Sequence, residues 1–63
     1  MSKLAQAKAK HETGVRALER LQLERADAKT TPERRDELRL EIPKLVAELR
    51  EINELILTLE GLA

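Results

Sequence analysis

The lysines and arginines of this 63-residue chain are its best candidates for functional residues, because their positive charges can bind an anion. The first 20 residues hold five bases against two acids, and the bases are Lys3, Lys8, Lys10, Arg16 and Arg20. On a helix, several of these side chains would form a ridge able to contact phosphates. No aromatic residue is present to stack on a base. The lack of a stacking residue, and the acidic end of the second half of the chain, make a small RNA-binding regulator the alternative and not the leading hypothesis, with these five basic residues as its nucleic-acid contacts.

A second basic group lies in the middle of the chain and consists of Arg25, Lys29, Arg34, Arg35 and Arg39. It could serve as a phosphate-contacting tip. However, the acids Asp36 and Glu37 are interleaved with it, and opposite charges three or four residues apart on a helix pair with each other. We interpret this group as a solvated helix face.

The sequence offers few residues that could bind a metal ion or catalyse a reaction. It has no cysteine and one histidine, His11, which cannot by itself build a metal site. We interpret His11 as an interface or surface residue, with a pH-sensitive contact or a ligand completed across an oligomer as the alternative. No nucleophile or carboxylate has an evident orienting partner. We expect a protein that is not an enzyme and needs no cofactor.

The strongest pattern of the sequence is a row of aliphatic residues in its second half. They follow one another in alternating steps of four and three residues, and they are Leu38, Ile42, Leu45, Leu49, Ile52, Ile56 and Leu59. This is the a and d spacing of a heptad repeat, which places all seven on one seam of a helix, and Ala63 continues it. Further apolar residues widen the stripe, namely Val46, Leu55, Leu57 and Leu62. A seam this regular is typical of a surface that packs on other helices.

The first half of the chain predicts a helix over about residues 3–28, rich in Ala, Lys, Glu and Leu. Its seam is weaker, with Leu18 and Leu21 as the large members. Gly14 falls on that seam, where glycine costs about 1 kcal/mol relative to alanine. It therefore either permits a close approach of backbone or marks a weak point.

A turn is predicted over about residues 29–31, followed by a second helix over about residues 32–60. Thr31 can cap this helix with Pro32 in its first position, or Thr30 and Glu33 can form a capping box. Pro43 lies off the seam, which favours one helix kinked near Pro43. Gly61 suits the end of the helix.

The short turn predicts an all-α, coiled-coil-like fold, in which the two helices pack as an antiparallel hairpin within a single domain. Folding the chain at residue 30 would set the basic first helix beside the acidic end of the second, with Lys3, Lys8 and Lys10 alongside Glu60, Glu54 and Glu51. The wide apolar stripe predicts further helices, and two hairpins closing a four-helix bundle is the simplest solution.

The leading functional hypothesis is a structural or adaptor protein that acts through helix–helix interaction and self-association, with a homodimer favoured. A further alternative is an inhibitor or subunit that docks on a larger protein partner. The sequence holds no apolar run long enough to span a membrane. We therefore expect a cytoplasmic protein without a membrane partner.

Overall fold

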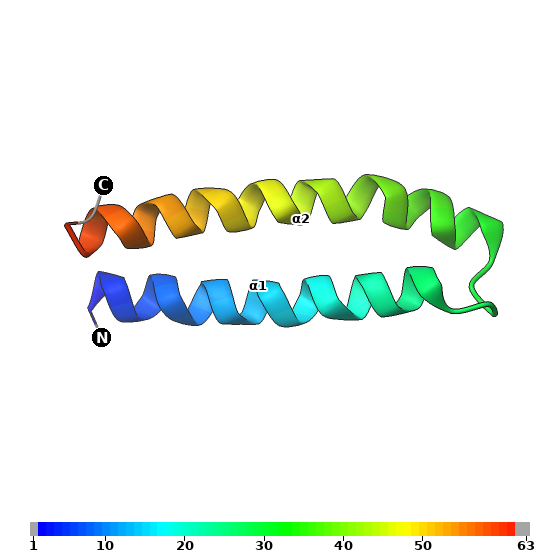
Figure 1. The fold of residues 1–63 in the computed structure, drawn as a ribbon, viewed down its shortest axis with the longest axis horizontal. Coiled ribbons are helices and arrows are strands. Elements are labelled where there is room, and N and C mark those ends of the chain that lie inside the picture. Colours follow the sequence, from blue (N-terminus) through cyan, green and yellow to red (C-terminus); the bar gives the residue numbers. More distant parts are fainter. Residues whose placement is uncertain (1, 62–63) are drawn as a thin grey trace.

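The computed structural model describes residues 2–61, which form two helices lying side by side and antiparallel (Figure 1). Helix α1 spans Lys3–Ala26 and helix α2 spans Pro32–Leu59. The molecule measures 44 × 18 × 14 Å. The prediction of an all-α fold built from two packed helices is confirmed. Ala63 and Leu62, which were expected to extend the seam and its flank, lie outside the described residues.

Helix α1 begins at a serine cap and ends two residues before the predicted end near residue 28. The hydroxyl of Ser2 accepts a hydrogen bond of 3.1 Å from the backbone N–H of Ala5. At the other end, Asp27 is extended, and its carboxylate accepts a bond of 2.9 Å from the N–H of Lys29. An aspartate that bonds its own backbone two residues on competes with helix. The connection therefore covers residues 27–31 in place of the predicted 29–31.

Thr31 caps α2, and Thr30 does not. The Thr31 hydroxyl accepts a bond of 3.2 Å from the N–H of Arg34, with Pro32 in the first helical turn. The Thr30 hydroxyl donates to the carbonyl of Glu24 at the end of α1. The two threonines therefore have separate roles, because one starts α2 and the other ties the connection to α1.

Helix α2 runs without a break through Pro43, which is exposed to solvent. A proline in a helix removes one backbone hydrogen bond, and at an exposed position water can bond the carbonyl that loses its partner. The helix ends where Gly61 adopts a φ of 75°, a left-handed conformation that glycine tolerates best.

The core contains only part of the predicted seam. Leu38 is fully buried, Ile42, Leu49 and Ile56 are nearly so, and Ala7 of α1 is buried as well. By contrast, Leu45 and Ile52 are half-buried, as are Leu18 and Leu21 of α1, and Leu59 is 38% exposed. Helix α1 covers the row of Ile42, Leu49 and Ile56 along its length. Of the other row, it buries Leu38 near the turn and leaves Leu45, Ile52 and Leu59 at its edge.

The register of the two helices differs from a fold at residue 30, which would place residue 46 beside Gly14. Gly14 instead lies against Leu49, three residues further along α2. Figure 1 shows the reason, since α2 begins beyond the end of α1 and the extended connection bridges the offset. The residue that faces Gly14 is therefore about one helical turn further along α2 than a fold at residue 30 predicts.

Candidate functional site

One long side of the hairpin is an apolar groove, which we call the open face. It is formed by Lys3, Lys10 and Gly14 of α1 and by Leu45, Ile52, Leu55 and Leu59 of α2. Two hollows of about 400 Å³ and 220 Å³ make up the groove. Lys10 and Ile52 line both hollows, so the groove is continuous along the half of the hairpin that holds the chain ends.

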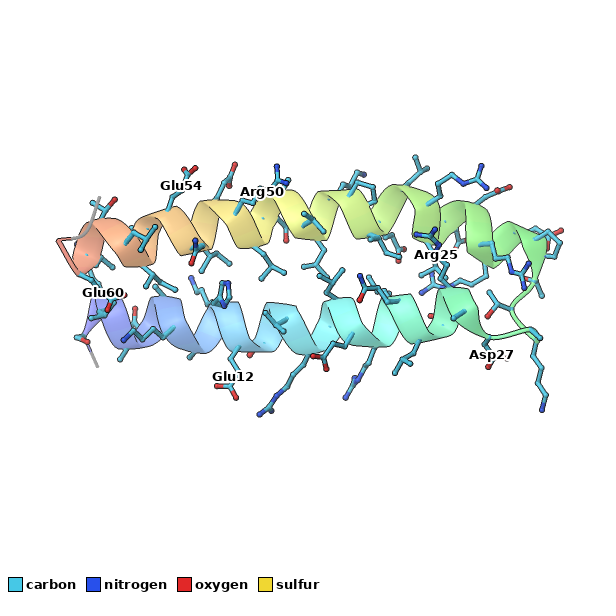
Figure 2. All side chains as sticks on the ribbon, viewed as in Figure 1. Glu12, Arg25, Asp27, Arg50, Glu54 and Glu60 are labelled. Atoms are coloured by element: carbon cyan, nitrogen blue, oxygen red, sulfur yellow. The ribbon has the colours of Figure 1, made fainter. Side chains whose placement is uncertain are left out.

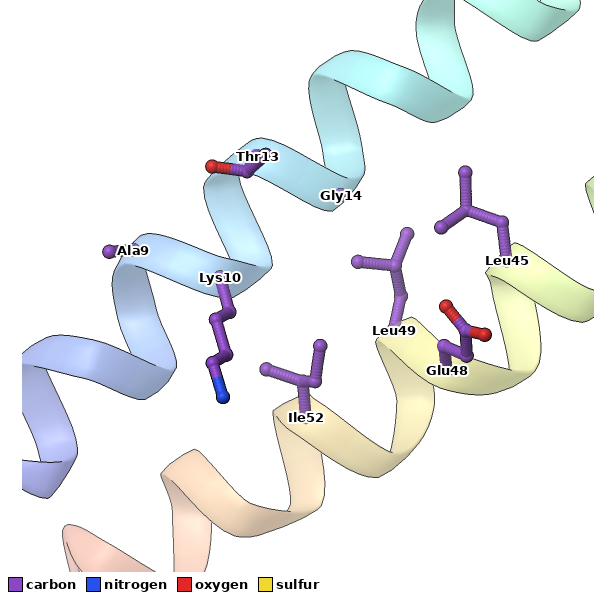
Figure 3. A pocket seen from close by; sticks show the side chains of 8 residues that line it. All are labelled: Ala9, Lys10, Thr13, Gly14, Leu45, Glu48, Leu49 and Ile52. Carbon is purple, nitrogen blue, oxygen red and sulfur yellow. The ribbon is translucent and has the colours of Figure 1, made fainter.

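The open face is apolar at its floor and charged at its margins. Figure 3 shows the Leu45, Leu49 and Ile52 side chains directed toward α1, with the Lys10 side chain extending toward Ile52. Glu48 stands at the α2 margin. A basic margin on one helix and an acidic margin on the other give the face charges of both signs.

The protein exposes more surface than a compact chain of its size. Its accessible surface is 5150 Å², whereas a folded monomer of 7.2 kDa exposes about 4,100 Å². Its radius of gyration is 14.4 Å, against about 11 Å for a globular domain of this length. Part of the excess is apolar, because Leu55 is 50% exposed on the open face.

The five basic residues predicted to contact nucleic acid do not form one patch. Lys3 and Lys10 line the open face. Lys8 pairs with Glu60 at 3.7 Å, and Arg16 pairs with Glu12 of its own helix at 2.8 Å. Arg20 is exposed further along α1.

Of the three lysines expected to meet glutamates of the second helix, Lys8 does so, with Glu60 as its partner in place of Glu54. Among residues 2–61, neither Lys3 nor Lys10 forms an ion pair. The exchange is in the same direction as the register offset at Gly14, toward residues further along α2, although Glu60 lies six residues beyond Glu54.

Arg34 joins the two helices close to the turn. Its guanidinium donates to both carboxylate oxygens of Glu24 on α1, at 2.6 Å and 3.0 Å. It also donates to Glu37 at 2.9 Å and to Glu41 at 3.4 Å. The hydrogen bonds with Glu24 and Glu37 raise the pKa of Arg34, and the bonds from Arg34 lower the pKa of Glu24.

The spacing of charges along the second helix predicts pairing within the second basic group but does not reveal Glu24 as a partner. Glu24 lies eight residues before Pro32, on the other helix, so no spacing along one helix could reveal the pair. Its position just before the turn was the available signal, because residues on either side of a hairpin turn face each other.

His11 is half-buried in a shallow hollow with Leu18, Val46 and Asn53. Within the described part of the chain, no three side chains of His, Cys, Asp or Glu come close enough to hold a metal ion. Neither α1 nor α2, as described, has the length and apolar character to cross a membrane.

The chain matches no known protein family, and no curated protein or solved structure is significantly similar to it.

Proposed function

We propose that this protein is a non-enzymatic structural or adaptor protein that self-associates through its open face, so that two hairpins close a four-helix bundle. The observation that supports the proposal is the uncovered half of the heptad seam. Leu45, Ile52 and Leu59 belong to the same repeat as the buried core residues, yet α1 leaves them at the edge of the groove. Removing apolar surface from water stabilises a contact by about 25 cal/mol per Å², so such an edge is a favourable docking surface.

The charges of the open face favour a second copy of the chain as its partner. When the twofold axis of the dimer runs parallel to the helix axes, α1 of one copy lies over α2 of the other. The Lys10 margin of each copy then faces the Glu48 margin of its partner. The alternative twofold sets α1 over α1 and brings lysines together. Since like charges in a contact are destabilising and opposite charges select the arrangement, the first twofold is the one we propose.

The test compares two leucines of α2 that are similarly exposed. Leu55 lies in the open face at 50% exposure, and Leu40 is 68% exposed outside it. We expect wild type and Leu40→Glu to sediment as helical dimers at micromolar concentration. Leu55→Glu places a charge in the proposed interface, so it should sediment as a monomer that retains helical circular dichroism.

A wild-type protein that remains a well-folded monomer at millimolar concentration would contradict self-association. An equal shift of the dimer equilibrium by Leu40→Glu and Leu55→Glu would contradict the assignment of the open face. If the wild-type protein remained a monomer, the groove would be the docking site for a larger protein partner, on which the chain would act as a subunit or inhibitor.

A further inference from the structure

A hollow lined by three arginines lies near the turn of the hairpin. Arg25 comes from the last turn of α1, and Arg35 and Arg39 come from successive turns of α2. Ile42 and Pro43 form its apolar part, and its volume is about 450 Å³. Figure 2 shows the Arg25 side chain directed from α1 toward α2. The other two arginines of the hollow belong to α2.

No ion pair among the described residues involves the arginines of this hollow. None of the acidic side chains in residues 2–61 lines the hollow. The contrast with Arg34 is direct, because that neighbouring arginine is surrounded by Glu24, Glu37 and Glu41. Three positive charges gathered in one place repel one another, and an anion bound between them relieves the repulsion.

One of the arginines is held in position by the backbone. Arg35 donates from Nη2 to the carbonyl oxygen of Asp27 at 3.3 Å. This bond fixes the guanidinium at the turn and leaves its remaining N–H groups free to donate. The end of α1 adds a partial negative charge of about one half nearby, which is small against three full positive charges.

We propose that the hollow formed by Arg25, Arg35 and Arg39 binds a compact, multiply charged phosphate group, such as a pyrophosphate. Guanidinium groups bind phosphate through paired N–H donors, which suits them to this ligand better than lysines. Three arginines around one hollow can contact the several negative charges that a pyrophosphate carries on neighbouring atoms. A nucleic-acid backbone carries single charges spaced along a strand, and no aromatic residue is available to stack its bases.

The phosphate site is independent of the proposed self-association. Arg39 and Leu45 are six residues apart on α2, which at 100° per residue separates them by about 120° around the helix. The hollow therefore lies outside the open face and stays accessible whether the protein is a monomer or a dimer. Failure of one proposal leaves the other in place.

The experiment is a titration of the protein labelled with ¹⁵N on its arginines, followed through the side-chain Nε–Hε signals. Sodium pyrophosphate is the probe, with sodium chloride at matched ionic strength as the reference. We expect saturable shifts of three Nε–Hε signals in pyrophosphate and none of comparable size in chloride. Arg39→Gln should weaken binding about tenfold, as expected for the loss of a charged hydrogen bond.

The matched control is Arg50→Gln. Arg50 is an exposed arginine of α2 that lies away from the hollow, so its removal changes net charge equally and should leave pyrophosphate affinity unchanged (Figure 2). Circular dichroism of both variants establishes that they are folded. Equal weakening by both variants, or shifts that do not saturate, would overturn the proposal.

Three further probes distinguish the possible classes of ligand, namely a nucleoside diphosphate, a short oligothymidylate and a glutamate-rich peptide. A nucleoside diphosphate that binds as well as pyrophosphate, or more tightly, supports the proposal and makes nucleotides a source. Pyrophosphate that binds while the nucleoside diphosphate does not also supports it and restricts the ligand to free polyphosphate. Binding confined to a short oligothymidylate, or to a glutamate-rich peptide, would overturn it.

Discussion

The backbone of Gly14 lies directly against the side chain of Leu49. A β carbon added to Gly14 would stand 2.5 Å from Cδ2 of Leu49 and 3.4 Å from its Cγ. The side chain of Leu49 therefore occupies the space that a β carbon would take at position 14. Of the two roles expected for Gly14, the structure supports the close approach.

This contact predicts that Gly14→Ala fails to deliver the stabilisation expected when glycine is replaced by the better helix former. The gain in helix propensity is about 1 kcal/mol. Overpacking a buried contact costs about 1–3 kcal/mol, and Leu49 is nearly buried. Leu49 meets the added methyl with the end of a flexible side chain that borders two hollows, so the cost should lie near the lower limit. We expect the cost to offset the gain and to leave the free energy of unfolding within about 0.5 kcal/mol of wild type, measured by urea unfolding.

The matched test of this explanation is the same substitution in a Leu49→Ala background. Without the leucine the clash is absent, so Gly14→Ala should there stabilise the protein by about 1 kcal/mol. An identical effect of Gly14→Ala in both backgrounds would show that Leu49 is not the cause.

Replacing Leu38 or Leu40 by alanine should change the stability of the protein by very different amounts, although both residues belong to α2. Leu38 is fully buried, whereas Leu40 is 68% exposed. Leu38→Ala should destabilise by about 2–5 kcal/mol through lost burial and a cavity. Leu40→Ala should change stability by less than about 0.5 kcal/mol. Thermal unfolding followed by circular dichroism measures both, and similar melting temperatures for the two variants would contradict the assigned core.

The Arg34–Glu24 pair predicts a loss of stability in acid. Bonding to Arg34 lowers the pKa of Glu24 below its usual value of 4.5, so the folded state favours the ionised carboxylate. The resulting stabilisation is present above pH 4.5 and is lost as the pH falls through the lowered pKa. Glu24→Gln should therefore flatten the fall in the urea midpoint below pH 4.5.

The control for the acid effect is Glu12→Gln, which removes an ion pair within α1 and leaves the contact between the helices in place. If Glu24→Gln and wild type lost stability in parallel as the pH fell, the pair would not be responsible.

The cap of α2 predicts a difference between two substitutions at Thr31. Thr31→Ala removes the hydroxyl that accepts from the N–H of Arg34, at a cost of about 1 kcal/mol. Thr31→Ser keeps the acceptor and should be close to wild type. Chemical denaturation distinguishes them, and equal stability of the alanine and serine variants would rule out a capping role.

The heptad pattern predicted which side of α2 is buried, because the 3.6-residue period of a helix converts spacing into direction. It could not show which of the two rows faces α1. Ile42, Leu49 and Ile56 are as apolar as Leu45 and Ile52, and only the position of α1 separates them.

Features near the turn were harder to predict, because several local structures compete there. Asp27 bonds its own backbone and ends α1 early, and the position of α2 then follows from the path of the connection. The sequence also placed Arg34 and Arg39 in one basic group. In the structure they differ, since the first is paired with acids and the second lines the arginine hollow.

The antiparallel arrangement places both chain ends at one end of the hairpin (Figure 1). A force applied between Ser2 and Gly61 would therefore pull across the helix axes and open the contact one turn at a time. The Lys8–Glu60 pair would break first, and the Arg34–Glu24 pair would break near the end. In an optical trap the hairpin should unzip progressively at low force, whereas pulling along the axes would shear the whole seam at once.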